Sequence, residues 1–110
     1  MKEPDRRSEK RVSMSRRATL SDGVNAYRCL LQDFSTRGFF FVTNQRFLVG
    51  QVLEFKCELY PDTPLTCKVE VKHISETCIG TKIVEINTVN QTLLQRFLQE
   101  YYSLKLNQSI

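Results

Sequence analysis

The stretch of this 110-residue chain that could carry chemistry is Asp33-Phe34-Ser35-Thr36-Arg37-Gly38. Asp33 and Ser35 are polar acceptors two positions apart, so both would face the same way on an extended strand. Gly38 permits a turn or a close backbone approach that a side chain would block. Apolar runs lie on both sides of the stretch, which is therefore predicted to be a polar corner between two strands.

A second polar group lies near the N-terminus, where Arg7 and Arg11 are four positions apart and Arg6 precedes them. Residues 1–17 hold seven basic and three acidic residues, whereas the remainder holds nine of each. All of the net charge of +4 therefore lies in this first region. A local excess of this kind indicates an anionic partner rather than charge spread for solubility.

The elements that position these residues follow from the hydrophobic pattern. Apolar and polar residues alternate from Leu53 to Leu59 and again from Cys67 to Val71, which is typical of strands with one buried face. Asp22-Gly23 predicts a tight hairpin, and Pro61-Asp62-Thr63-Pro64 predicts a turn. Six short strands are predicted, at residues 14–20, 26–32, 39–43, 53–59, 65–74 and 78–86.

The C-terminal part of the chain changes to a helical period. Thr88 is expected to be the N-cap, with Gln91 reaching back to it in a capping box. The helix is predicted over about residues 89–104. The apolar residues that would share one helix face are Val89, Leu93, Phe97, Tyr101 and Leu104, with Leu94 and Leu98 widening the stripe.

Six short strands followed by one helix predict an all-β domain with a single helix, built as an antiparallel barrel or sandwich. The helix would close one barrel mouth or cover one face. The length suits one domain. We expect a flexible, basic, ligand-binding arm at residues 1–13 and the folded domain at residues 14–110.

The four cysteines, Cys29, Cys57, Cys67 and Cys78, lie in predicted strands among apolar neighbours, so they are expected to be buried reduced thiols. No C-x-x-C pair accompanies His73, which argues against a zinc site. Because no nucleophile with a base and an orienting group is visible, an enzyme is not expected. No apolar run has the length of a membrane span, and no secretory signal is visible, so cytoplasmic residence is expected.

The two polar stretches together resemble those of the PilZ domain family, bacterial receptors for cyclic di-guanosine monophosphate (cyclic di-GMP). Arg7-Ser8-Glu9-Lys10-Arg11 matches the R-x-x-x-R motif of that family, and residues 33–38 match its D/N-x-S-x-x-G motif. Residues 47–51 and 79–83 are similar to two glycine-containing strand segments of the family. The resemblance covers nearly the whole chain.

The resemblance implies a six-stranded antiparallel β-barrel of the PilZ type that binds cyclic di-GMP. An arginine fork suits both halves of that ligand, since it pairs with phosphate and with the Hoogsteen edge of guanine. Arg6, directly before the motif, resembles the arrangement that binds two stacked ligand molecules, so two per site is our hypothesis. The implied ligand-binding residues are Arg6, Arg7, Arg11, Asp33, Ser35 and Gly38, with Arg37 and Gly80 as secondary candidates.

The resemblance also implies that the output passes through a protein partner, in the control of motility, exopolysaccharide synthesis or biofilm formation. The ligand would order the arm against the barrel. Phe39-Phe40-Phe41 is apolar on both strand faces, which makes a homodimer plausible.

Two alternatives remain open. The first is a PilZ-fold adaptor that binds only proteins. The second is a small barrel that binds single-stranded RNA, because residues 37–42 partly resemble the aromatic strand motif of an RNA-recognition domain. Phe40 stands where that motif requires Gly or Ala, so a nucleic-acid partner is disfavoured.

Overall fold

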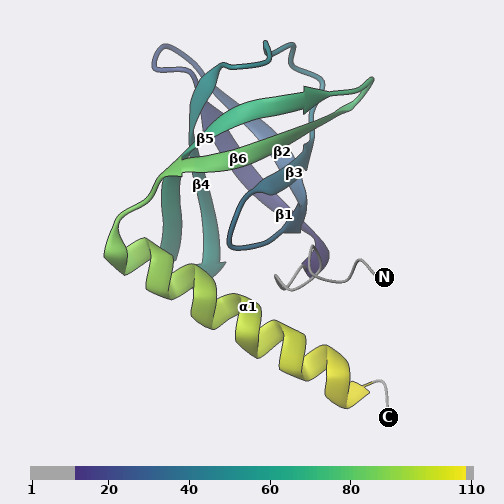
Figure 1. The fold of residues 1–110 in the computed structure, drawn as a ribbon, viewed down its shortest axis with the longest axis vertical. Coiled ribbons are helices and arrows are strands. Elements are labelled where there is room, and N and C mark those ends of the chain that lie inside the picture. Colours follow the sequence, from purple (N-terminus) through teal and green to yellow (C-terminus); the bar gives the residue numbers. More distant parts are fainter. Residues whose placement is uncertain (1–11, 109–110) are drawn as a thin grey trace, which may run out of the picture.

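The structure is a computed structural model that describes residues 12–108, with the side chains of residues 15–101. The strands and the helix within these residues follow one another along the chain (Figure 1). They are β1 (Val12–Ser21), β2 (Ala26–Phe34), β3 (Phe39–Val42), β4 (Val52–Tyr60), β5 (Thr63–Ile74), β6 (Cys78–Glu85) and α1 (Thr88–Gln108).

The strands close into a barrel in the order β1-β2-β3-β6-β5-β4, and every neighbouring pair is antiparallel. Each strand therefore has a paired strand on both sides, although β1 and β4 pair only through Thr19–Ser21 and Glu54–Lys56. The prediction of a six-stranded antiparallel barrel with one C-terminal helix is confirmed.

Several predicted strand ends were wrong by a few residues. The second strand continues to Phe34 because Asp33 and Phe34 still pair with both neighbouring strands. The predicted turn at residues 61–64 is shorter, since Thr63 and Pro64 already pair with β4. Asp62 adopts a positive φ of 59° in the two-residue connection that remains.

The start of the helix also differs from the prediction. Asn87, not Thr88, is the N-cap, because its side-chain oxygen accepts a 2.8 Å hydrogen bond from the backbone N–H of Asn90. Its carbonyl accepts the backbone N–H of Gln91 at 2.9 Å. Asparagine caps a helix better than threonine, and it precedes the first helical residue here. The helix then runs to Gln108, four residues beyond the predicted end.

The core of the barrel consists of the alternate residues that point inward. Phe39 is buried there and stacks on Phe55, with ring centroids 4.5 Å apart. Burial raises the pKa of the thiols of Cys29 and Cys67 to about 12 and that of Cys57 to about 11. These three are buried free thiols as predicted, whereas Cys78 is only half-buried. Within residues 15–101 no group of three His, Cys, Asp or Glu side chains could hold a metal ion.

The helix lies across one end of the barrel (Figure 1). Leu94, Phe97 and Leu98 are buried there, and Leu93 and Tyr101 are partly buried. The expected stripe was wrong at its first residue, because the first helical turn contacts the barrel through Asn90, whose side-chain oxygen accepts the backbone N–H of Thr66 at 2.9 Å, and the buried apolar contacts begin later. Val89 is accordingly 76% exposed.

Among residues 12–108, no helix is both long and apolar enough to cross a membrane.

Candidate functional site

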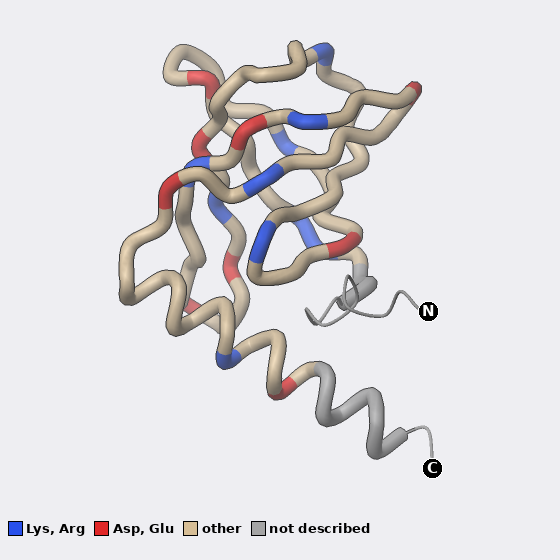
Figure 2. Tube along the Cα trace, viewed as in Figure 1, with Lys and Arg blue, Asp and Glu red and all other residues tan. Residues whose placement is uncertain are grey.

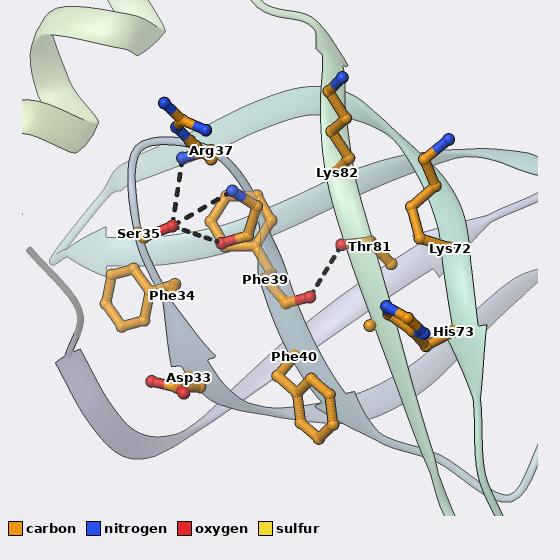
Figure 3. A pocket seen from close by; sticks show the side chains of 12 residues that line it. Asp33, Phe34, Ser35, Arg37, Phe39, Phe40, Lys72, His73, Thr81 and Lys82 are labelled. Atoms are coloured by element: carbon orange, nitrogen blue, oxygen red, sulfur yellow. Dashed lines mark hydrogen bonds between the residues drawn. The ribbon is translucent and has the colours of Figure 1, made fainter. Parts of the chain in front are cut away.

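The D-x-S-x-x-G stretch forms the turn that joins β2 to β3. The backbone N–H of Ser35 donates to the carbonyl of Gly38 at 3.0 Å, which closes the turn. The Ser35 hydroxyl oxygen accepts the backbone N–H groups of Arg37 at 3.1 Å and Gly38 at 3.3 Å (Figure 3). Ser35 is 2% exposed, and these hydrogen bonds show that its side chain shapes the turn.

Gly38 brings this turn into contact with β6. A Cβ atom at this position would lie 3.0 Å from the carbonyl carbon of Thr81 and 3.1 Å from the Cα of Lys82, so no side chain fits. The Arg37 carbonyl accepts the backbone N–H of Ile83 at 2.7 Å, and the Thr81 hydroxyl donates to the Phe39 carbonyl at 3.0 Å. The predicted close backbone approach at Gly38 is confirmed, and it fixes the turn against the barrel wall.

Phe34, inside the motif, points the opposite way from Asp33. Its ring is 1% exposed and stacks on Phe97 of α1, with centroids 5.5 Å apart. The guanidinium of Arg16 lies 5.4 Å from the centroid of Phe97, over the same ring. Asp33 therefore lies on the outer surface of the barrel, and the next residue, Phe34, contacts α1. The motif connects the outer surface with the helix.

A row of paired residues crosses four strands beside this turn. Asp33 of β2 pairs with Phe40 of β3, Phe40 pairs with Gly80 of β6, and Gly80 pairs with His73 of β5. Directly paired residues project from the same face of a sheet. The outer face of the barrel therefore presents, from β2 to β5, a carboxylate, a phenyl ring, a glycine without a side chain and an imidazole.

This row crosses a surface cavity, which we call the first cavity. Its volume is about 560 Å³, within the range of small-molecule sites. The described residues that line it include three cations, Arg37, Lys72 and Lys82, against one carboxylate, Asp33, which leaves a formal charge of +2. Lysines 72 and 82 extend in the same direction from neighbouring strands (Figure 3). Blue segments of the β2–β3 turn, β6 and β5 lie close together in Figure 2.

The structure brings together all the predicted site residues that it describes. Asp33, Ser35, Arg37, Gly38 and Gly80 line the first cavity. The predicted arm, residues 1–13, lies largely outside the described residues, and Arg6, Arg7 and Arg11 all fall in the part that is not described.

Among the residues of the cavity wall that sequence reasoning missed, four are exposed, namely Phe40, Lys72, His73 and Lys82. Strict alternation along β5 would put Lys72 and His73 on opposite faces. The register of β5 against β6 shifts between Val71 and His73, and both side chains become exposed. A bulge leaves no distinct local signal in this sequence. The apolar run Phe39-Phe40-Phe41 was interpreted as a possible dimer contact and not as part of this wall.

A second cavity, of about 430 Å³, lies on the outer surface of β1, β4 and β5 and reaches the end of β6. Its charged residues are two carboxylates, Glu54 and Glu85, and two lysines, Lys56 and Lys68. Lys68 and Glu85 form an ion pair at 3.8 Å.

The fold and the first cavity together define a small closed barrel whose β2–β3 turn forms a cationic surface site. A family model described as PilZ domain matches residues 5–100, and the chain belongs to the PilZ domain family. No curated protein sequence matches the chain.

Three solved structures share the fold. The *Bacillus subtilis* inhibitor of motility (MotI/DgrA) is 21% identical with a TM-score of 0.75, and the match covers 93% of this chain and 52% of that one. The PilZ domain of CeSA from a cellulose-synthesizing bacterium is 9% identical with a TM-score of 0.69, covering 84% of this chain and 97% of that one. *K. pneumonia* MrkH in its apo state is 14% identical with a TM-score of 0.72, covering 91% and 52%. The chain thus spans about half the length of two of these proteins.

Proposed function

We propose that this protein is a receptor for cyclic di-GMP that relays the presence of this second messenger to a protein partner. One observation carries the proposal. The first cavity gathers every described residue of the D-x-S-x-x-G motif that was expected to contact the ligand, within a wall of positive charge. The family membership of the chain supports it.

The chemistry of the wall suits both parts of this ligand. A guanine presents N–H donors on its Watson–Crick edge, and the Asp33 carboxylate is an acceptor for them. The two phosphates are anionic, and Arg37, Lys72 and Lys82 supply cations on the other side of the cavity. Adenine places an acceptor where guanine carries a donor, so Asp33 would disfavour the adenine analogue.

The first strand of the barrel follows the R-x-x-x-R motif in the sequence and begins beside this cavity. Ser13 pairs with Asp33 and Val12 pairs with Phe34, so β1 begins next to the D-x-S-x-x-G motif. Arg7 is five residues before Val12, a distance of at most about 18 Å for an extended chain. We propose that Arg7 and Arg11 bind the ligand from this side, that Arg6 allows a second stacked molecule, and that binding orders the arm.

The signal would leave the site by two routes, the ordered arm and helix α1. Phe34 joins the motif to Phe97, so a ligand that shifts the turn changes the packing of the helix. The partner is a protein whose binding depends on these surfaces. An inhibitor of motility is among the structural neighbours, and this supports motility as the first output to test.

Isothermal calorimetry with cyclic di-GMP tests the proposal directly. We expect micromolar or tighter binding to the wild type, loss of that binding in Arg7→Ala, and no change in the control Arg46→Ala, which alters an exposed arginine that does not line the cavity. Cyclic di-AMP serves as the control ligand. Two ligands per chain that become one in Arg6→Ala would support the stacked pair, whereas one ligand per chain in both proteins would refute it.

No heat and no thermal shift for the wild type would refute the receptor proposal. The fold would be unaffected, and a PilZ-domain adaptor that binds only proteins would then be the better description.

A further inference from the structure

Phe40 is an exposed aromatic residue in the middle of a strand, next to the proposed ligand contacts. Its side chain is on the outer face of β3, and the residue is 38% exposed, whereas Phe39 and Phe41 on either side are buried in the barrel core. A single exposed apolar residue is normal on a protein surface and is not in itself evidence of a site. The residues around Phe40 indicate a binding surface.

Gly80 and His73 form the rest of this surface. Phe40 pairs with Gly80, and Gly80 pairs with His73. A Cβ atom on Gly80 would lie 3.3 Å from Cε1 of Phe40 and 3.5 Å from Cδ2 of His73, so both rings flank the bare Cα of the glycine. Figure 3 shows the two rings on opposite sides of β6. Phe40, Gly80 and His73 thus form a surface of two rings with no side chain between them, which we call the platform.

The platform lies one strand away from Asp33, because Asp33 is the direct partner of Phe40. Neighbouring strands are about 4.8 Å apart, so a flat heterocycle lying on Phe40 would bring its edge to the Asp33 carboxylate. The face of a phenyl ring carries a negative quadrupole, which disfavours a phosphate there and favours a π-stacked base. The phosphates would instead lie towards Lys72 and Lys82, farther along the cavity.

We propose that Phe40, bordered by His73 and left uncovered by Gly80, is the surface on which one guanine base of the ligand stacks. This inference rests on the proposed function and assigns a part of the site that lies outside both sequence motifs. Phe40 would hold the plane of the base, while Asp33 would read its edge. Gly80 would act as a positioning residue, since any side chain there would press on the ring of Phe40.

The chain contains no tryptophan, which allows a direct spectroscopic test. Phe40→Trp places a single indole on the platform, and guanine quenches indole fluorescence on stacking. Val52→Trp is the matched control, because Val52 is 50% exposed on β4 and does not line the first cavity. On titration with cyclic di-GMP we expect strong quenching in Phe40→Trp, with the midpoint that calorimetry gives for the same variant, and little change in Val52→Trp.

Affinity gives a second readout. Phe40→Leu keeps an apolar side chain but removes the aromatic face, and we expect it to weaken binding roughly threefold to tenfold. Phe40→Ala should weaken it roughly tenfold or more, and Gly80→Ala should also weaken it. Thermal unfolding of each variant establishes that the barrel is folded.

The outcomes separate the two proposals. If the wild type binds cyclic di-GMP but Phe40→Leu binds equally well and Phe40→Trp is no more quenched than Val52→Trp, the platform is refuted while the receptor proposal stands. If the wild type does not bind, both are refuted.

Discussion

The first and second cavities lie on the outside of the same barrel, and they differ in charge and in what their aromatic residues do. The first has a formal charge of +2 and an exposed ring, Phe40. The second has two lysines and two glutamates, and its one phenylalanine, Phe55, is 1% exposed and belongs to the core. Two cavities on one fold can therefore differ greatly in how well they suit an anionic ligand that contains a base.

The pairing of the strands accounts for part of the difference. Along the second cavity, β4 and β5 pair without a register shift from Val52 to Glu58, so side chains of opposite charge such as Glu54 and Lys68 lie directly opposite each other. At the first cavity, the register shifts between Leu31 and Asp33 on β2 and again after Val71 on β5. Such irregularities redirect side chains, and these two lie on strands that line the first cavity. The second cavity has an irregularity too, between Lys68 and Val69 of β5 against β6, but there Lys68 stays paired with Glu85 and the charges balance.

The largest expected effect concerns the turn that forms the wall of the first cavity. Gly38→Ala should lower the free energy of unfolding by about 3 kcal/mol, because the new Cβ meets the backbone of β6, which has little room to move. Gly50→Ala is the control: its φ is +94° but nothing lies within 4 Å of a Cβ there, so only backbone strain of about 1 kcal/mol is expected. Urea unfolding of both variants measures the difference, and equal losses would mean that the turn is not held against β6.

The next effect compares the carboxylates of the two cavities. Asp33→Ala should weaken cyclic di-GMP binding by about 2 kcal/mol, roughly 30-fold, since a hydrogen bond to a charged group is lost. Glu54→Ala removes a carboxylate from the second cavity and should leave the affinity unchanged. Calorimetry on both variants provides the measurement. A comparable loss in Glu54→Ala would show that the second cavity takes part in binding.

Much of this arrangement could be predicted from the sequence. The alternation from Leu53 to Leu59 predicted β4 within one residue at each end, because one buried face requires that period. The helical period predicted α1, and the tight approach of Gly38 followed from its lack of a side chain. These features depend on local pattern, which the sequence carries directly.

The rest depends on contacts between distant segments. Lys72 and Lys82 reach one cavity only through the pairing of β5 with β6 and its register shift, which no local pattern encodes. Phe40 faces outward next to Gly80 for the same reason, since the register of β3 against β6 brings them together. The role of Ser35 was also hidden, because its hydroxyl is occupied by the backbone of its own turn. The prediction that Arg6, Arg7 and Arg11 bind the ligand remains a prediction.

The smallest expected effect compares single lysines of the two cavities. Lys82→Gln should weaken cyclic di-GMP binding by about 0.5 kcal/mol at low ionic strength. The effect is small because water and salt screen the attraction between an exposed cation and the phosphates. The loss should shrink further as salt is added. Lys68→Gln is the matched control, since that lysine is at the second cavity and pairs with Glu85. Calorimetry at two salt concentrations measures both. If the two variants lose affinity equally, the positive charge acts over the whole barrel and the excess at the first cavity has no special role.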